Sequence, residues 1–492
     1  MLKASRSRPL IFTPKRQKHV IPLLKPAPQS SSQDFILKLQ PNWKVVKNSQ
    51  KKVLDDDKIE DFTRSIIQYY TIRDTSTKKL LVKTPPLEKV QSGEAPPLFI
   101  RKCNTCCGFC DFSSEENDYS LKILKTTLIT ELIEAIQSPK VAKVLTIECI
   151  QAFFKMFSVN IFRPLINIPI LRANDTAYDL EWIHLRAFYD VFTKFMYTDT
   201  IRPNFVANQI DEMFIHNLFQ CIRFPDKREQ KCACELLLAI AERYNFTGKI
   251  YMIEFSHFMS TASYDIYTQN SLNSLFDFFG EWTTIYKGKE WLAFFQNVFL
   301  PLMLLGSFNL FEKSFTQVVC IFIRKNKLFV DTYLDHIFKH WPIVSPNKAK
   351  FYLNSLQTVI ENFSRNISAY ITLRLVAHIS SLFNDCTSSL SQQSFRVFQS
   401  TTFLNLLSSV WNEIGVTVYN SAKMSYNSHW NSETREMASK FLSFLESIDN
   451  DISKKECSNC GSQREDKWKQ ILNVAEINTN DKFLFIEKYS VL

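Results

Sequence analysis

Cysteines are the side chains in this sequence whose spacing most resembles a metal site. Four lie close together and two form a Cys-x-x-Cys pair near the C-terminus: Cys103, Cys106, Cys107, Cys110, Cys457 and Cys460. Two thiolate pairs at such spacing can close a tetrahedral zinc site. The first four, at positions i, i+3, i+4 and i+7, also form one face of a helix, where cysteine packs as a small hydrophobe. We expect the packed helix face and no metal, and keep a zinc protein as an alternative.

Other candidates for catalysis are isolated. The eight histidines are scattered along the chain, with no His-Glu-x-x-His motif. His184, next to Trp182 in an apolar helical stretch, is expected to be a core or turn histidine. No glycine-rich phosphate motif occurs, and eight glycines in 492 residues leave little room for turns that need positive φ. We therefore expect no enzymatic activity and no cofactor.

Positive charge is concentrated at the N-terminus. The net charge is +10, and all seven charged residues before Asp34 are basic: Lys3, Arg6, Arg8, Lys15, Arg16, Lys18 and Lys25. The remaining chain is nearly neutral, which argues against a surface that neutralises nucleic-acid phosphates. The run from Pro14 to His19 resembles a nuclear import signal and is equally consistent with a solvated basic tail.

Nothing in the sequence indicates secretion or membrane insertion. Residues 1–30 lack the continuous apolar core of a signal peptide. The longest apolar run, from Val298 to Leu305, is too short to span a bilayer. Reduced cysteines and a cytoplasmic or nuclear location are the expectation.

The periodicity of apolar residues predicts an all-α fold for most of the chain. The helices of this fold would position any functional site. Large apolar residues recur at three- and four-residue steps from about Leu124 to Ile448, for example at Leu185, Phe188 and Phe192. Polar, proline-marked turns separate these segments, and the segments pair at roughly 40-residue intervals, as in HEAT and armadillo repeats. The sequence therefore predicts a HEAT/armadillo-like α-solenoid, a superhelix of antiparallel helix pairs.

Composition divides the chain into three parts. Residues 1–97 are basic and proline-rich and are expected to be a mostly disordered tail, with a short helix over Asp55 to Tyr70. Residues 98–449 are expected to form the solenoid, and residues 450–492 a separate C-terminal segment.

From Pro97 to about Asp449 the sequence resembles the B-prime regulatory subunits of protein phosphatase type 2A. The matching segments, in order, are Leu98-Phe-Ile100, Cys106-Cys107, Asp111-Phe112, Met156 to Arg163, Trp182 to Leu185, Pro203-Asn204, Ile210-Asp211, Arg228-Glu229, Phe299-Leu-Pro301, Trp341-Pro342, Ser345-Pro346, Phe351 to Asn354 and His429-Trp-Asn431. Their colinear order carries the resemblance. It implies an α-solenoid without catalysis that docks on the phosphatase scaffold and catalytic subunits and selects phosphoprotein substrates.

The resemblance also implies a groove that binds LxxIxE substrate motifs through a His-Arg-x-Tyr cluster and a further arginine. Carried across without gaps, these anchors fall on Leu238, Ala239, Ala241 and Gly248. Arg243 and Lys249 lie within a turn or two and are the candidate substitutes for the lost cations. The acidic position on the facing helix is kept as Asp277, with Phe278 and Trp282 nearby. Because the anchoring cation and aromatic are absent, we expect the usual motif not to be bound.

Exposed loops between helices are the expected contacts with scaffold and catalytic subunits, because such loops line one edge of a solenoid. The candidates are Pro203, Asn204, Asp211, Asp226, Arg228, Glu229, Ser345 and Lys348. A free-standing solenoid adaptor, such as a nuclear transport or assembly factor, is the competing hypothesis, and co-purification of a phosphatase distinguishes the two.

Overall fold

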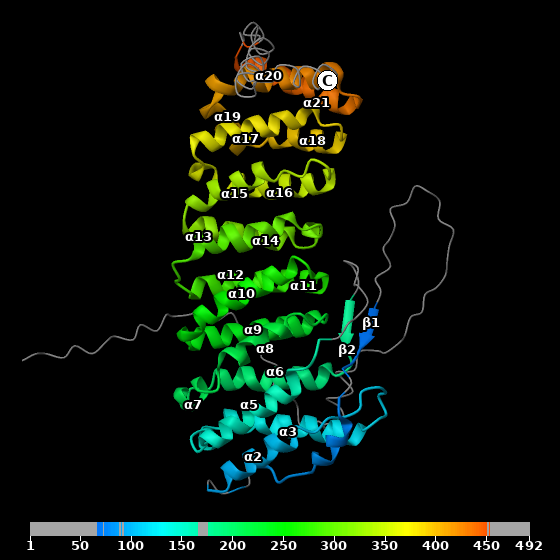
Figure 1. Cartoon of the computed structure of the whole chain (residues 1–492), viewed down its shortest axis with the longest axis vertical. Helices are drawn as coiled ribbons and strands as arrows, with labels where there is room; N and C mark the ends of the chain where they lie inside the picture. The colour runs from blue at the N-terminus through cyan, green and yellow to red at the C-terminus, as the bar shows by residue number, and fades with distance from the viewer. Residues whose placement is uncertain are drawn as a thin grey trace, which may run out of the picture.

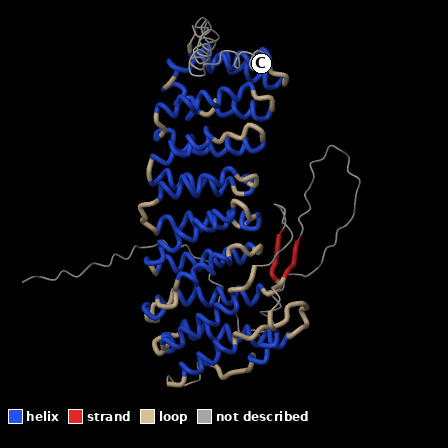
Figure 2. Tube along the Cα trace, viewed as in Figure 1, coloured by secondary structure: helices blue, strands red, loops and turns tan. Residues whose placement is uncertain are grey.

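The computed structural model describes residues 66–452 apart from 72, 88–89, 91–92, 166–175 and 450–451. Within these residues the chain is a stack of helices with one two-stranded sheet at its side (Figure 1). The expected α-solenoid is confirmed. Figure 2 shows how short the strands are beside the helices.

The first half of the stack contains the sheet and nine helices of the described range. Their bounds are β1 (Ile66–Tyr69), α2 (Ala95–Thr105), α3 (Tyr119–Gln137), α4 (Pro139–Ala142), α5 (Ile147–Ile161), β2 (Thr176–Asp179), α6 (Trp182–Met196), α7 (Pro203–Ala207), α8 (Glu212–Cys221), α9 (Lys227–Arg243) and α10 (Gly248–Ala262). Short 3₁₀ turns, η1 (Thr75–Leu80) and η3 (Asn245–Thr247), connect some of them.

The second half continues in the same way to the end of the described residues. It contains α11 (Ile266–Asn270), α12 (Leu272–Ile285), α13 (Trp291–Phe294), α14 (Glu312–Lys325), α15 (Leu328–Lys339), α16 (Pro346–Phe363), α17 (Ala369–Ser381), α18 (Ser388–Val397), α19 (Thr401–Ser409), α20 (Trp411–Ser428) and α21 (Ser432–Ile448). Its shorter turns are the π-helical η4 (Phe295–Phe299) and the 3₁₀ segments η5 (Leu300–Leu304), η6 (Phe308–Leu310), η7 (Ser364–Asn366) and η8 (Leu382–Asn384).

The helices form two rows. Helices α3, α6, α9, α12, α14, α16, α18 and α21 contact one another in succession and form the first row. The second row includes α5, α8, α10, α15, α17 and α20. Each apolar stripe is buried against the next helix of its own row and against the other row, so the stack has one continuous core.

Phenylalanine fills much of the space between the rows. Phe153 of α5 stacks on Phe195 of α6 with ring centroids 4.5 Å apart, and Phe157 lies 4.2 Å from Phe192. Phe214 of α8 stacks on Phe192 at 5.7 Å. Such aromatic pairs add stabilisation beyond the burial of their area.

The N-terminal boundary differs from the expected one. The described structure begins at Ile66, well before Leu98, and Ile66–Tyr69 is a strand where a helix over residues 55–70 was expected. This strand pairs in parallel with β2, with Tyr69 opposite Asp179. Four residues carry no readable period, and their partner lies more than a hundred positions away, so the strand escaped the sequence pattern. Residues 55–65, 450, 451 and 453–492 lie outside the described range.

Candidate functional site

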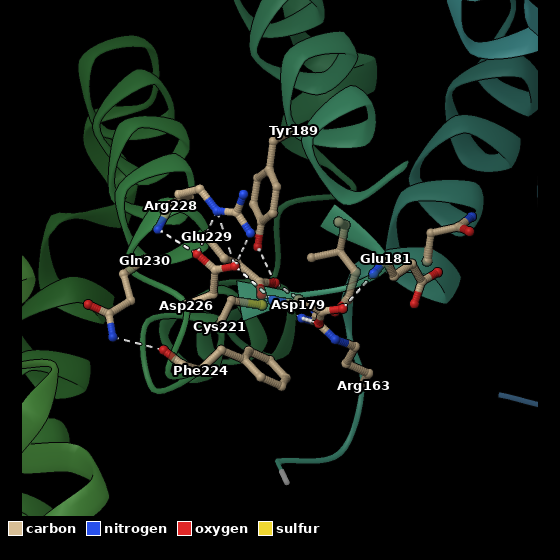
Figure 3. A network of polar contacts seen from close by, with 12 residues as sticks. Arg163, Asp179, Glu181, Tyr189, Cys221, Phe224, Asp226, Arg228, Glu229 and Gln230 are labelled. Atoms are coloured by element: carbon tan, nitrogen blue, oxygen red, sulfur yellow. Dashed lines mark hydrogen bonds and ion pairs between the residues drawn. The ribbon is translucent and has the colours of Figure 1, made fainter. Parts of the chain in front are cut away.

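A buried network of charges joins the small sheet to the helices (Figure 3). Arg163, just after α5, donates from both terminal nitrogens to the two carboxylate oxygens of Glu229, at 2.5 Å each. The same guanidinium contacts Asp179 at the end of β2 at 2.9 Å and lies over the Phe224 ring at 3.9 Å. The side chains of all three charged residues are fully buried.

Asp226 completes this network at the N-terminus of α9. Its carboxylate accepts the backbone N–H of Arg228 at 2.9 Å and that of Asp179 at 3.0 Å, so it caps α9 and binds the outer edge of β2. Arg228 contacts the same carboxylate at 2.6 Å. Asp226 and Glu229 are both 0% exposed. The expectation that they contact a scaffold subunit is therefore wrong; they position the fold. Arg228 remains partly exposed.

Burial controls the ionisation of this network. It raises the pKa of Asp179 to about 6, although Arg163 opposes the shift, and it also raises the pKa of Glu229. Burial alone would lower the pKa of Arg163, but the neighbouring Glu229 and Asp179 carboxylates raise it by more, so the pKa lies above its ordinary value. Arg163 binds the Glu229 carboxylate through two parallel hydrogen bonds and also contacts Asp179, so it holds α5, β2 and α9 in a fixed relative position.

The expected substrate groove lies where α9 packs on α12. Ala239 and Ala241 of α9 are buried, as are Phe278 and Trp282 of α12. Leu238 is half-buried and Asp277 is exposed. The four buried side chains pack within the core and offer no surface to a peptide. That this chain does not bind the usual motif stays a prediction.

Tyr286, which sequence reasoning missed, occupies the space beside Gly248. A Cβ on Gly248 would lie 2.4 Å from the Tyr286 ring. The ring stacks on Trp282 with centroids 4.9 Å apart and meets Trp291 edge-on at 5.7 Å. A side chain at position 248 and the present Tyr286 conformation exclude each other.

The two cations considered as substitutes for the missing anchors differ in their surroundings. Arg243 is turned toward the end of α6, where it donates to the carbonyls of Met196 and, at 3.2 Å, Thr198. These bonds hold the guanidinium against the turn that follows α6. Lys249 is exposed at the start of α10.

The turns that join a second-row helix to the next first-row helix form one edge of the stack, which we call the loop edge. It comprises residues 222–226, 263–271, 305–311, 340–345, 382–387 and 429–431. Three pairs of successive turns are hydrogen-bonded: Arg223 to Asp265 at 2.8 Å, Ser307 to Gln269 at 2.6 Å, and Trp430 to the Cys386 carbonyl at 2.9 Å. Lys348, just past the loop edge, donates to the Leu304 carbonyl at 2.7 Å.

The contact candidates divide between the two edges. Ser345 and Lys348 lie at the loop edge, as does Arg228 beside the turn before α9. Pro203, Asn204 and Asp211 lie in the connection from α6 to α8, which is at the other edge, next to the C-terminus of α9. The expectation of a single edge is wrong for these three, because that connection runs from the first row to the second.

Ile343 and Val344 are the most exposed large apolar residues of the described chain, at 89% and 96%. Both lie on the loop edge before α16. Sequence reasoning placed a contact loop from Val344 onward but named Ser345 and Lys348. Two adjacent β-branched residues in a turn were the signal that would have identified them.

A model of the family "Protein phosphatase 2A regulatory B subunit (B56 family)" matches residues 84–476. This chain belongs to that family. Three curated relatives are regulatory subunits of serine/threonine protein phosphatase 2A. The B' theta isoform of Arabidopsis thaliana is 21% identical over 79% of this chain and 83% of its own. The delta 1 isoform of Schizosaccharomyces pombe is 22% identical over 88% and 84%, and the human delta isoform 22% over 82% and 70%.

The cysteine cluster of this B56-family chain packs within the core. Cys103 belongs to α2, Cys106 caps it, and Cys110 follows in the next loop; all three are buried. The helix ends at Thr105, so only part of the expected four-cysteine face is helical. Burial raises the pKa of Cys106 to about 12, which disfavours the thiolate that a metal requires.

The zinc alternative finds no support in the described range. No group of three or more potential metal ligands is present there. Cys457 and Cys460 lie outside the described residues. None of the described helices is long and apolar enough to cross a membrane.

Proposed function

We propose that this chain is a regulatory subunit that docks on the scaffold and catalytic subunits of protein phosphatase 2A and selects phosphoprotein substrates. The family match over residues 84–476 carries this proposal. The relatives are named as regulatory subunits of that phosphatase, which favours this function over a free-standing adaptor.

We propose further that the chain has no catalysis of its own. His184, the histidine nearest a cavity, is buried and its pKa is lowered to about 3, so it is a poor general base at neutral pH. The buried cysteines have raised pKa values and are weak nucleophiles. The purified chain should therefore release no phosphate from p-nitrophenyl phosphate without a catalytic subunit.

The loop edge is the proposed docking surface for the phosphatase core. Hydrogen bonds join three pairs of its turns and stiffen those parts of the edge, and Ile343 and Val344 supply apolar area that is exposed in the free chain. A surface that is already rigid before binding loses less conformational entropy when a partner docks, which favours association.

Affinity purification of the tagged full chain tests the proposal. Scaffold and catalytic subunits should be recovered in amounts equal to the chain. Recovery of the chain without a phosphatase, or with substoichiometric phosphatase only, would support the free-standing adaptor. We place the protein in the cytoplasm or, if residues 14–19 act as an import signal, in the nucleus; fluorescence microscopy with and without those residues tests the location.

A further inference from the structure

The outer edge of β1 has no hydrogen-bonded partner among the residues that the structure describes. In the β1–β2 pair the Leu180 N–H donates to the Tyr69 carbonyl at 2.8 Å, so the backbone groups of Tyr69 face β2. Orientation alternates along a strand, and the N–H and C=O of Gln68 therefore point away from β2. No described residue bonds to them. The outer edge of β2, by contrast, is closed by Asp226.

A cavity of about 240 Å³ lies beside this outer edge. Gln68 belongs both to the outer edge of β1 and to the wall of the cavity. The rest of the wall surface is mainly apolar. It includes Phe112, Tyr119, Ile123, Leu180 and Ile183. A volume of this size accommodates one large side chain.

One residue that lines the cavity, His184, has a buried ring nitrogen without a hydrogen-bond partner among the described residues. The Nε2 of His184 donates to the Lys122 carbonyl at 3.2 Å, which leaves Nδ1 as an acceptor. Nδ1 is buried and has no partner among the described residues. The Phe112 ring, which also lines the cavity, stands edge-on against His184 with ring centroids 5.1 Å apart.

The rim of the cavity carries an excess of negative charge. The loop between α2 and α3 forms part of this rim through residues 112–115 and carries four carboxylates: Glu115, which lines the cavity, and Asp111, Glu116 and Asp118 close to it in the sequence. Lys78 pairs with Asp118 at 3.3 Å, and Lys122 lies over the Phe112 ring at 4.7 Å. Glu115 and Glu116 have no salt bridge to a described residue, unlike Asp118, and the rim therefore favours a segment with basic residues.

One segment of this chain has the matching chemistry. Residues 43–47 read Trp-Lys-Val-Val-Lys, and no proline occurs between Pro41 and Pro85. Tryptophan has a large apolar ring with one N–H donor, valine favours a strand, and the lysines complement the rim. Residues 48–65 span up to about 60 Å when extended, enough to return the segment to β1 in either direction.

We propose that residues 43–47 add to the outer edge of β1 as a third strand, with the Trp43 side chain in the cavity beside Phe112 and His184. Backbone pairing supplies affinity and the cavity supplies specificity, as in other strand additions. The site is independent of the phosphatase partners and stands or falls separately from them.

Hydrogen–deuterium exchange of the full chain, read by mass spectrometry, tests the docking. The amides of residues 43–47 should exchange at least about tenfold more slowly than those of an unstructured peptide. Q68P removes the outward N–H without breaking the β1–β2 pair and should abolish this protection, whereas the matched Q68T should retain it. Unchanged exchange of residues 176–181 verifies that the sheet remains folded.

W43A should also release the segment, and tenfold dilution of the unaltered protein should leave its protection unchanged. Fast exchange of residues 43–47 in the unaltered chain would overturn the proposal. So would protection that survives Q68P, or protection that is lost on dilution, which would indicate a second copy as the occupant.

Discussion

At the residue scale, Arg163 is the side chain that links β2 to the helices in the N-terminal third of the stack. It lies between two carboxylates contributed by α9 and β2, and all three side chains are fully buried. A buried ion pair contributes little net stability over an apolar pair of the same shape, but removing one partner leaves an unpaired charge. The joint therefore fixes the geometry of β2 more than it raises the stability of the stack.

Arg163→Met should lower the free energy of unfolding by about 3–5 kcal/mol, because Glu229 and Asp179 stay buried without their cation. Adding Glu229→Met should recover part of the loss. Denaturant titration of the two single variants and the double variant measures the coupling. Additive effects of the two substitutions would contradict the ion pair.

Asp179 gives the chain a pH dependence of known sign. Its pKa is about 6 in the fold against an ordinary 3.8, so the folded chain binds this proton more tightly than the unfolded chain. The stabilisation is complete below about pH 4 and is lost as pH rises to about 6, a change of roughly 3 kcal/mol at most. Asp179→Asn should lack this component. Unfolding of both proteins at pH 4.5 and 7.5 measures it; an equal pH effect in both would contradict the assignment.

At the element scale, the start of α10 packs against an aromatic ring from the end of α12. Tyr286, at the end of α12, lies against Gly248 at the start of α10 and stacks on Trp282. The Tyr286 ring can therefore occupy this place only because position 248 has no side chain.

Gly248→Ala should cost about 1–3 kcal/mol of stability, because its Cβ forces the Tyr286 ring out of its place. In a Tyr286→Ala background the same substitution should cost close to nothing, since the obstructing ring is gone. Thermal unfolding of the four proteins measures this coupling. A cost that is the same in both backgrounds would show that the ring is not responsible.

The groove between α9 and α12 should not bind a peptide with an LxxIxE motif. The anchor positions are apolar, and an unpaired glutamate in the motif would lose about 2–5 kcal/mol of binding free energy. Isothermal titration calorimetry should show no saturable heat. A micromolar dissociation constant would refute the prediction.

At the scale of the whole molecule, the two-row stack turns separate loops into one surface. Ile343→Ser with Val344→Ser should leave thermal stability within about 0.5 kcal/mol, because both side chains are exposed. The double variant should recover less scaffold and catalytic subunit in affinity purification. Phe246→Ser, an exposed residue at the opposite edge, is the matched control. Equal recovery from all three proteins would exclude the loop edge as the docking surface.

The sequence by itself determined the helical class and the family. Both follow from local information: the apolar period of segments such as Leu185 to Met196, and the order of short motifs from Leu98 to Asn431. The recurrence of Leu185, Phe188 and Phe192 likewise indicated a helix where α6 is observed.

Only the tertiary structure decided which polar residues are buried and which edge each loop occupies. Asp226 and Glu229 look like solvated turn residues in the sequence, because their partners Arg163 and Asp179 lie about 50 to 70 positions away. The four-residue strand β1 is likewise specified by β2 and by the burial of Tyr69, since such a short strand has no period of its own. Contacts between distant segments decide these features, and a local pattern does not contain them.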